Sequence, residues 1–290
     1  GAIQSPQLLM LSGIGPPEQL KEFGIPVVSP LPGVGRQLQD HFQARCVFRC
    51  RKAVTLNDVQ HSLGRKLLAA LEWALLRKGP LTVSAGVATL FWKTRPDGDR
   101  PDIEFHVIPF SADRPGQPLH RFSAFTISVC QLRPESRGEI RLRSPDPHDP
   151  PRIFANYLAS ETDRRTMVEG MKLIRRIVAK PAMTPWVSGE HLPGAACQTD
   201  DELLDFIRRT GTTIFHPCCT CAMGGDAEPL AVVDPRLRVR GVSGLRVVDA
   251  SVMPAVVSAN TNATVIMIAE KAADMIREDA RLHAAAAVMV

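Results

Sequence analysis

The stretch Gly244–Ile276, GLRVVDASVMPAVVSANTNATVIMIAEKAADMI, predicts the architecture of the last third of the chain. Leu245–Val248 is a short apolar run that is typical of a buried strand. After Asn262 the apolar residues recur at helical spacing to about Ile276, which predicts a long helix. We therefore expect a strand, a loop that contains Asp249, and a helix in succession.

The loop and the helix start carry the polar groups of this stretch. Asp249 follows the predicted strand, where a carboxylate can bind a ribose or ribityl hydroxyl. Residues Asn260–Thr264 stand at the start of the predicted helix, whose unpaired N–H groups and dipole favour negative charge. The same pattern is typical of a strand end followed by an ordinary Asn/Thr helix cap, and taken alone it favours that structural interpretation.

A second polar loop lies upstream, TTIFHPCCTCAMG at residues 212–224. His216 titrates near neutral pH and can take or give a proton during turnover. Taken alone, the local sequence favours a histidine with a structural role.

The CxxC of Cys218 and Cys221 next to His216 leaves a metal-binding or redox-thiol module open. A structural zinc site needs a second ligand pair, for which Cys46 and Cys50 are a weak match. A redox CxxC would be expected before a helix pattern, which is missing here.

The beginning of the chain contains two further motifs. GAIQSPQLLMLSGIG at residues 1–15 predicts a short helix that starts at Ser5 and Pro6 and includes Leu8–Leu11. LPGVGRQLQDH at residues 31–41 is a Pro/Gly turn cluster. Its glycines would let the backbone approach a ligand closely, although a lone GxG is weak evidence for a nucleotide site.

The middle of the chain mixes strand and helix signals. Apolar runs bounded by Pro, Gly and Asp predict strands at Ile103–Ile108, Ala124–Val129 and Glu139–Leu142. Helical spacing and capping-box patterns predict helices at Lys66–Arg77, from Ser160 to about Lys180, and from Thr199 to about Arg209.

The totals exclude several classes of protein. The 290 residues carry a net charge of +5 with dispersed Lys and Arg, so nucleic acid is not expected as a partner. Seven cysteines at uneven spacing imply no disulfide framework and favour a reducing compartment. No signal peptide or transmembrane span is visible, because the apolar run Leu67–Leu76 is short and contains Glu72. The first residue is Gly1 rather than Met, and we expect the chain to be a fragment.

Together these motifs resemble the glucose–methanol–choline (GMC) oxidoreductase family. GAIQSPQLLMLSGIG fits the family's second signature, and LPGVGRQLQDH resembles LPGVGxNLxDH, with Gln37 where Asn is usual. HPCCTCAMG resembles HPxGTxxMG, closest to the choline dehydrogenase-like branch. Residues 232–254 and 258–276 resemble the C-terminal block of the family. The resemblance covers nearly the whole chain and is weakest over residues 42–135.

The resemblance implies an enzyme that oxidises an alcohol to an aldehyde by hydride transfer to N5 of its FAD. His216 corresponds to the general base, and Asn260 to the second catalytic position, where it would hold the substrate oxygen by hydrogen bonding. The implied cofactor-binding residues are Phe215, Asp249, Ala250, Thr261 and Asn262. No metal ligand is implied, and we interpret Cys218, Cys219 and Cys221 as packing residues.

Two features depart from the pattern of the family. The N-terminal GxGxxG segment, which holds the ADP half of FAD, is not in the sequence, so we predict that these 290 residues alone bind FAD weakly or not at all. Choline enzymes place a glutamate opposite the trimethylammonium group. In GPLTVSAGVATLFWK, residues 79–93, our alignment puts Val87 at that place. We therefore expect a neutral primary alcohol as the substrate rather than choline.

The expected fold class is α/β and α+β. It combines a partial FAD-binding, Rossmann-like domain with a substrate-binding domain, an antiparallel sheet backed by helices. We assign residues 1–41 and 211–282 to the FAD-binding domain, 42–210 to the substrate-binding domain, and 283–290 to a tail.

The expected partner is a small-molecule alcohol, and the motifs do not indicate the electron acceptor. A homo-oligomer is compatible with the sequence. The cytoplasm is the favoured location, with peripheral membrane or mitochondrial association as alternatives. Two other functions stay open: a metal- or redox-thiol-binding module, which metal analysis would detect, and an inactive truncated fragment, which an in-frame GxGxxG upstream in the gene would indicate.

Overall fold

The computed structural model describes residues 1–84, 86–114 and 116–288, with side chains through residue 282. The chain divides into two compact units. Unit 1 comprises Gly1–His41, Arg133–Ser160 and Ile214–Val290, and unit 2 comprises Phe42–Leu132 and Glu161–Thr213. Among the described residues, no helix is long and apolar enough to cross a membrane.

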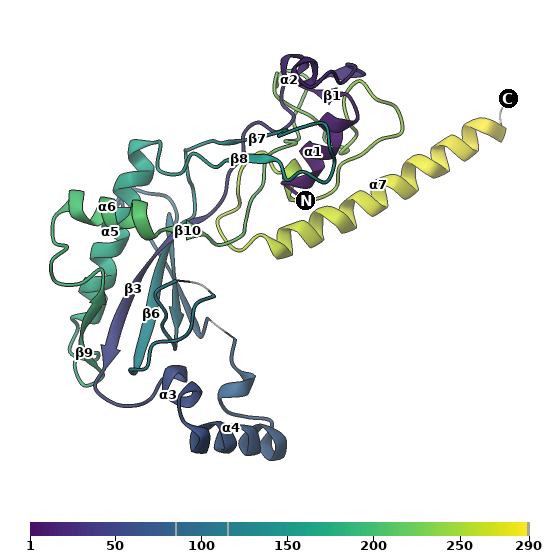
Figure 1. Ribbon diagram of the computed structural model, residues 1–290. Helices are drawn as coiled ribbons and strands as arrows, with labels where there is room; N and C mark the ends of the chain where they lie inside the picture. The colour runs from purple at the N-terminus through teal and green to yellow at the C-terminus, as the bar shows by residue number, and fades with distance from the viewer. Residues whose placement is uncertain (85, 115, 289–290) are drawn as a thin grey trace. The chain divides into compact units, whose positions relative to one another are not determined.

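In the described residues, unit 2 is built on a six-stranded antiparallel sheet (Figure 1). Its strands are β3 (Phe42–Cys50), β4 (Ala88–Trp92), β5 (Ile103–Ile108), β6 (Ala124–Gln131), β9 (Val187–Leu192) and β10 (Thr212–Thr213). The order is β10-β3-β6-β5-β4, and β9 also pairs with β3. The predicted antiparallel sheet is confirmed, and β5 and β6 lie where apolar runs predicted strands.

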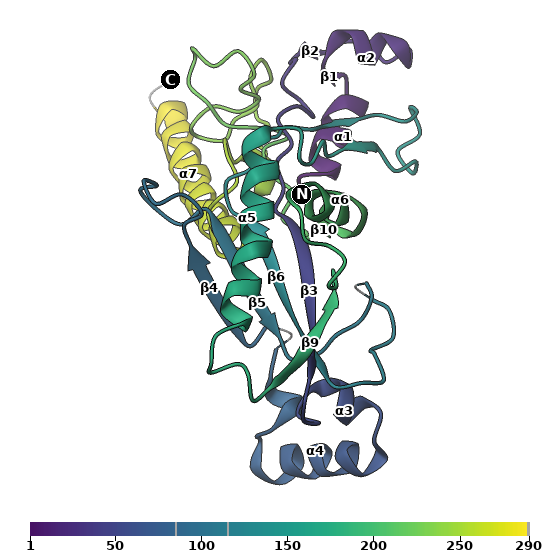
Figure 2. The ribbon, with the colours of Figure 1, turned by 90° about the vertical axis from the view of Figure 1, so that its left-hand side faces the viewer.

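Some of the helices of unit 2 pack on this sheet. The helices of unit 2 are α3 (Leu56–Gln60), α4 (Leu63–Leu76), α5 (Glu161–Val178), α6 (Asp200–Thr210) and the short 3-10 helix η1 (Pro80–Thr82). Figure 2 shows α5 across one face of the sheet, where it contacts β3 and β6. Met167, Met171 and Ile174, which set the helical spacing in the sequence, are fully buried, and each contributes about 1.5–3 kcal/mol by leaving water. Gly170 permits this approach, because a Cβ there would lie 2.4 Å from a methyl group of Val129.

The predicted capping box of α6 is confirmed. The Thr199 hydroxyl accepts a hydrogen bond from the Glu202 amide at 3.3 Å, and the Glu202 carboxylate accepts one from the Thr199 amide at 2.8 Å. Two backbone donors that the helix cannot satisfy internally are thereby paired.

Unit 1 contains two short strand pairs and mostly irregular backbone around one apolar core. Its elements are α1 (Gln4–Leu11), β1 (Ile14–Gly15), α2 (Pro17–Glu22), β2 (Ser29–Pro30), β7 (Glu139–Arg141), β8 (Arg152–Phe154), the 3-10 helix η2 (Ala250–Val252) and α7 (Asn262–Val288). β1 and β2 are parallel, and β7 and β8 are antiparallel. Buried side chains from all three segments of the unit meet in the core, among them Met10, Ile140, Val232 and Val252.

Residues 133–160 differ from their expected assignment to the substrate-binding domain, because they pack in unit 1. The Ile140 amide donates to the Gly35 carbonyl at 2.7 Å. Leu38 and Gly138 exchange two backbone hydrogen bonds. The strand at β7 was predictable from its alternation, but its contact with the 31–41 turn was not.

The predicted strand Leu245–Val248 is wrong. The amide of Val247 donates to Leu237, and the carbonyl of Leu245 accepts from Val239, but the pairing is limited to an isolated bridge. The run is apolar because Val247 contacts the core, and it has no partner strand. The predicted last helix is confirmed but longer, since α7 continues to Val288 through most of the expected tail, and residues 289–290 lie outside the described part.

Candidate active site

His216 lies in the loop that follows β10, and a buried carboxylate fixes its backbone. The His216 amide donates to Asp40 Oδ1 at 2.9 Å, and the hydroxyl of Tyr157 donates to Asp40 Oδ2. Asp40 is 7% exposed. Both carboxylate oxygens of Asp40 therefore accept hydrogen bonds, as a buried charge requires.

The ring of His216 contacts a second histidine, His41, which is fully buried. The two Nδ1 atoms are 2.9 Å apart, and the ring planes cross at 75°. One Nδ1 must carry the proton and the other must accept it, so the contact couples the tautomers of the two rings.

Asp40 and His41 are functional candidates that the sequence reasoning missed. They end the motif LPGVGRQLQDH, which was used only as a turn and as a family resemblance. Gln39 in the same motif also exchanges backbone hydrogen bonds with Cys218, at 2.9 and 3.2 Å. The motif match was the signal that could have assigned these residues to the site.

The His216 loop also pairs with the segment that contains two of the predicted cofactor-binding residues. Three backbone amides of the loop donate to three successive carbonyls: Cys219 to Ala250 at 3.3 Å, Cys221 to Ser251 at 2.9 Å, and Met223 to Val252 at 2.8 Å. The structure thus places Ala250, and Asp249 just before it, beside the loop.

Asp249 has a clear structural role. Its Oδ2 accepts from the Ser5 hydroxyl at 2.6 Å, and its Oδ1 accepts from the Ser251 amide at 2.7 Å, which caps η2. Burial alone would raise the pKa of this carboxyl, but the hydrogen bonds from Ser5 and Ser251 outweigh burial and hold the pKa below its ordinary value. Asp249 therefore connects α1 to the strand-like segment before η2.

The remaining predicted residues are mostly exposed. Asn260 and Asn262 are exposed and Thr261 is buried, at the N-terminus of α7. The Phe215 ring is 79% exposed, and its backbone has a φ of 65°. A bulky residue in the left-handed region is uncommon and costs energy. Such strained backbone is concentrated at functional sites.

The GVG turn serves the fold rather than a ligand. A Cβ on Gly33 would lie 2.1 Å from the Leu230 carbonyl oxygen, and one on Gly35 would lie 2.3 Å from that of Ile140. The close approach that the glycines permit is therefore to other backbone of unit 1. The interpretation of this turn as a ligand contact is not supported.

The cysteines of the loop belong to the core of unit 1. Cys218, Cys219 and Cys221 are fully buried. Burial raises the pKa of Cys221 to about 12, and the contact with Cys219, 3.2 Å between sulfurs, together with burial raises the pKa of Cys218. Such thiols are poor nucleophiles at neutral pH, which supports their interpretation as packing residues.

An open cavity of about 770 Å³ lies elsewhere in unit 1. Its lining includes Arg36, Gln37, Phe154 and Asn156. It contains none of the predicted site residues, so its size does not make it the candidate active site.

The comparisons with known proteins agree with the motifs. The GMC oxidoreductase models match residues 1–43 and residues 134–269, which together make up more than half of the chain. The chain belongs to the GMC oxidoreductase family.

Similar relatives include two dehydrogenases and an oxidase. Human mitochondrial choline dehydrogenase is 45% identical over 96% of this chain and 46% of its own length. The alcohol dehydrogenase (acceptor) of Pseudomonas putida is 42% identical over 95% of this chain and 50% of its own length. A solved structure of an Aspergillus oryzae formate oxidase variant, studied for FAD modification, has a TM-score of 0.88 at 27% identity, over 96% of this chain and 53% of that one. The chain spans about half the length of the curated relatives it matches.

Proposed function

We propose that this chain carries the catalytic residues of an FAD-dependent alcohol oxidoreductase, with His216 as the general base and Asn260 as the residue that holds the substrate oxygen. The observation that carries the proposal is the Nδ1–Nδ1 contact of His41 and His216. A histidine whose tautomer is coupled to that of a buried partner can transfer a proton at its other nitrogen.

The residues of unit 1 fit a flavin. Phe215 offers an exposed aromatic ring on a strained backbone, and the N-terminus of α7 at Asn262 offers unpaired amides that favour negative charge. Both features suit a planar ring that becomes anionic on reduction. FAD, when bound, supplies the hydride acceptor. The similar formate oxidase structure comes from work on FAD modification in that enzyme.

The proton of the alcohol goes to His216 in this account. Nδ1 of His216 carries a hydrogen and donates it to Nδ1 of His41, so Nε2 of His216 is unprotonated and can accept the hydroxyl proton. The imidazolium that results keeps the same hydrogen bond to His41, which stabilises the positive charge. A positioned base of this kind contributes roughly 10²–10⁴-fold to the rate.

Asn260 has a different role, because an amide cannot act as a base at neutral pH. Its side-chain NH₂ group donates to the substrate oxygen and orients the alcohol toward His216. Its exposed position, two residues before the start of α7, is compatible with contact to a small ligand.

The substrate we propose is a neutral primary alcohol. Val87, at the position where choline enzymes have glutamate, offers no charge to a cation. The nearby sheet has a buried carboxylate in Glu104, 2% exposed, but its Oε1 lies 3.1 Å from Nε2 of His106. Its Oε2 is buried and has no hydrogen-bond partner among the described residues, so Glu104 is the carboxylate that a test of substrate charge has to include.

The test compares choline with an uncharged primary alcohol of similar size, using the full-length protein and an artificial electron acceptor. We expect kcat/KM to be at least about tenfold higher for the uncharged alcohol, because Val87 offers the cation no charge. Glu104→Gln should leave this ratio unchanged. Equal kcat/KM values, or a preference for choline that Glu104→Gln abolishes, would contradict the substrate assignment but not the role of His216.

We place the protein in the cytoplasm, and one observation favours peripheral membrane association as the alternative. Helix α4 exposes Leu63, Leu67 and Leu75 by 87, 62 and 78%, and Arg77 and Lys78 follow it. A helix with apolar and basic side chains can lie on an anionic lipid surface. Cosedimentation with anionic phospholipid vesicles distinguishes the two: recovery in the supernatant supports the cytoplasm, and recovery with the vesicles supports the alternative.

A further inference from the structure

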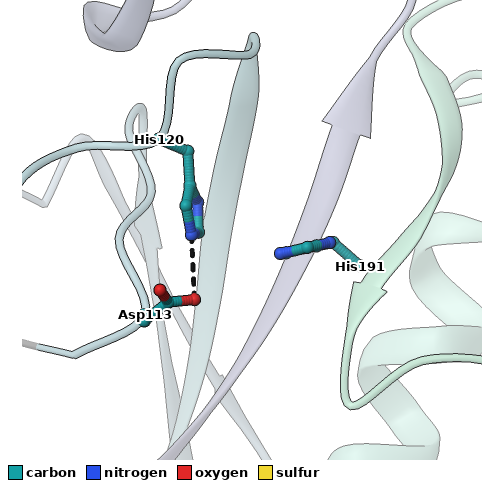
Figure 3. A group of neighbouring side chains, drawn as sticks. All are labelled: Asp113, His120 and His191. Carbon is teal, nitrogen blue, oxygen red and sulfur yellow. Dashed lines mark hydrogen bonds and ion pairs between the residues drawn. The ribbon is translucent and has the colours of Figure 1, made fainter.

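Three potential metal ligands converge in unit 2, on side chains that no step of the proposed reaction uses. Asp113 and His120 lie in the segment between β5 and β6, and His191 lies on β9. One ligand atom from each residue lies within 4.8 Å of the other two. Figure 3 shows the His120 ring pointing to the carboxylate of Asp113 and the His191 ring extending toward this pair from a neighbouring element.

His120 is held in place by buried polar groups. Its Nδ1 lies 3.0 Å from the hydroxyl of Ser111, and its Nε2 lies 3.0 Å from Asp113 Oδ1. Asn57 donates to the same hydroxyl at 3.1 Å and to the carbonyl of His120 at 2.9 Å. Asn57 and Ser111 are each 1% exposed. Metal-binding histidines are commonly oriented by hydrogen bonds from such buried polar groups.

The Ser111 hydroxyl suits both a metal-free and a metal-bound site. A hydroxyl can rotate either to donate to Nδ1 of His120 or to accept from it. In the first case Nε2 carries a hydrogen and donates to Asp113. In the second case Nε2 presents its lone pair, which is the form that binds a metal.

His191 reaches the cluster from β9, a separate element from the segment that carries Asp113 and His120. The Arg49 guanidinium stacks on Phe122 at 3.9 Å and lies 3.5 Å from Nδ1 of His191. Its positive charge opposes a cation and sets a limit on the affinity.

We propose that Asp113, His120 and His191 form a binding site for one divalent transition-metal ion of the zinc class, with water in the remaining position. Two imidazoles and one carboxylate favour such an ion over Mg²⁺ or Ca²⁺, which select oxygen ligands. Tetrahedral zinc needs ligand atoms about 3.3 Å apart at bond lengths near 2.0–2.1 Å, and the exposed Asp113 side chain can close the remaining distance. The bound ion joins the β5–β6 segment to β9.

The test uses the 290-residue protein after treatment with a chelator. Titration with Zn²⁺ by calorimetry should give one site per chain. Asp113→Asn and His191→Ala should each weaken Zn²⁺ binding by about 10–100-fold or more, in line with the effect of losing a group that supports a metal. His148→Ala, which changes an exposed histidine of unit 1, should leave the affinity unchanged. Arg49→Gln should tighten binding, because it removes a charge that repels the ion.

Titration with Co²⁺ identifies the ligand atoms. Visible absorption without a thiolate charge-transfer band supports the proposed site. A thiolate band, as expected for a site at Cys218 and Cys221, would overturn it, as would wild-type affinity in Asp113→Asn and His191→Ala. Circular dichroism of the exposed-site variant Asp113→Asn verifies that the fold is retained, and failure of the intact protein to bind Zn²⁺ also overturns the proposal.

Discussion

Nδ1 of His41 lies 2.9 Å from Nδ1 of His216. The pair joins the end of the 31–41 turn to the loop after β10, although the two residues are far apart in sequence. Asp40, adjacent to His41, fixes the backbone of His216 at the same place. Two consecutive residues of one motif therefore hold the backbone of the proposed base and couple its tautomer to that of His41.

Replacement of His41 tests its action through His216. In the full-length protein, His41→Phe removes the acceptor that stabilises protonated His216, so kcat should fall by about tenfold or more and the acid limb of the kcat/KM profile should move to lower pH. His41→Asn keeps an acceptor and should retain more activity. Equal losses in the two variants with an unchanged pH profile would indicate a purely structural role.

The hydrogen bond between Ser5 and Asp249 predicts a pH-dependent stability. The pKa of Asp249 is lowered in the folded protein, so its contribution is complete above the unfolded value near 3.9 and is lost as pH falls through the folded value. Ser5→Ala should cost roughly 1–2 kcal/mol of unfolding free energy at pH 7, and the difference from wild type should shrink at an acidic pH below the unfolded value near 3.9.

Urea unfolding at both pH values measures this effect. Ser12→Ala, at the exposed other end of α1, is the matched control and should change the unfolding free energy little at either pH. A loss in Ser5→Ala that is independent of pH would contradict the role assigned to the Asp249 carboxylate.

Gln37 occupies a backbone conformation that suits asparagine better. Its φ is 63°, and Asn tolerates the left-handed region more readily than other non-glycine residues. Gln37→Asn should therefore stabilise the protein by about 0.5–1 kcal/mol, measured by urea unfolding. Arg137 Nε donates a hydrogen bond to Gln37 Oε1 at 3.2 Å, and Gln37→Asn loses this bond. Gln37→Ala loses the same bond but lacks the tolerance of asparagine for the left-handed region, so it is the control. Lower stability of Gln37→Asn than of Gln37→Ala would refute this explanation.

Local patterns predicted the elements that depend on local chemistry. The capping box at Thr199 and Glu202 and the buried spacing of Met167 and Met171 are properties of one helix each, and α6 and α5 form where they were expected. The strand predicted at Leu245–Val248 was wrong because burial against a core and pairing in a sheet favour the same residue types.

The site depended on contacts that no local pattern contains. His216 by itself was best explained as structural, and the resemblance to the family raised it to a candidate base. The partnership with His41 is visible only once the 31–41 turn and the 214–224 loop are seen together. The same holds for Asp113 and His191, which lie on separate elements of unit 2 and meet only in the folded chain.

The central claim is that His216 is the base that takes the alcohol proton. The most direct measurement is the anaerobic reduction of the flavin by a primary alcohol, followed by absorbance in full-length protein that carries His216→Ala. We predict that the variant retains its flavin and that the reduction rate falls by roughly 10²–10⁴-fold. Flavin reduction at the wild-type rate in the flavin-loaded variant would contradict the account.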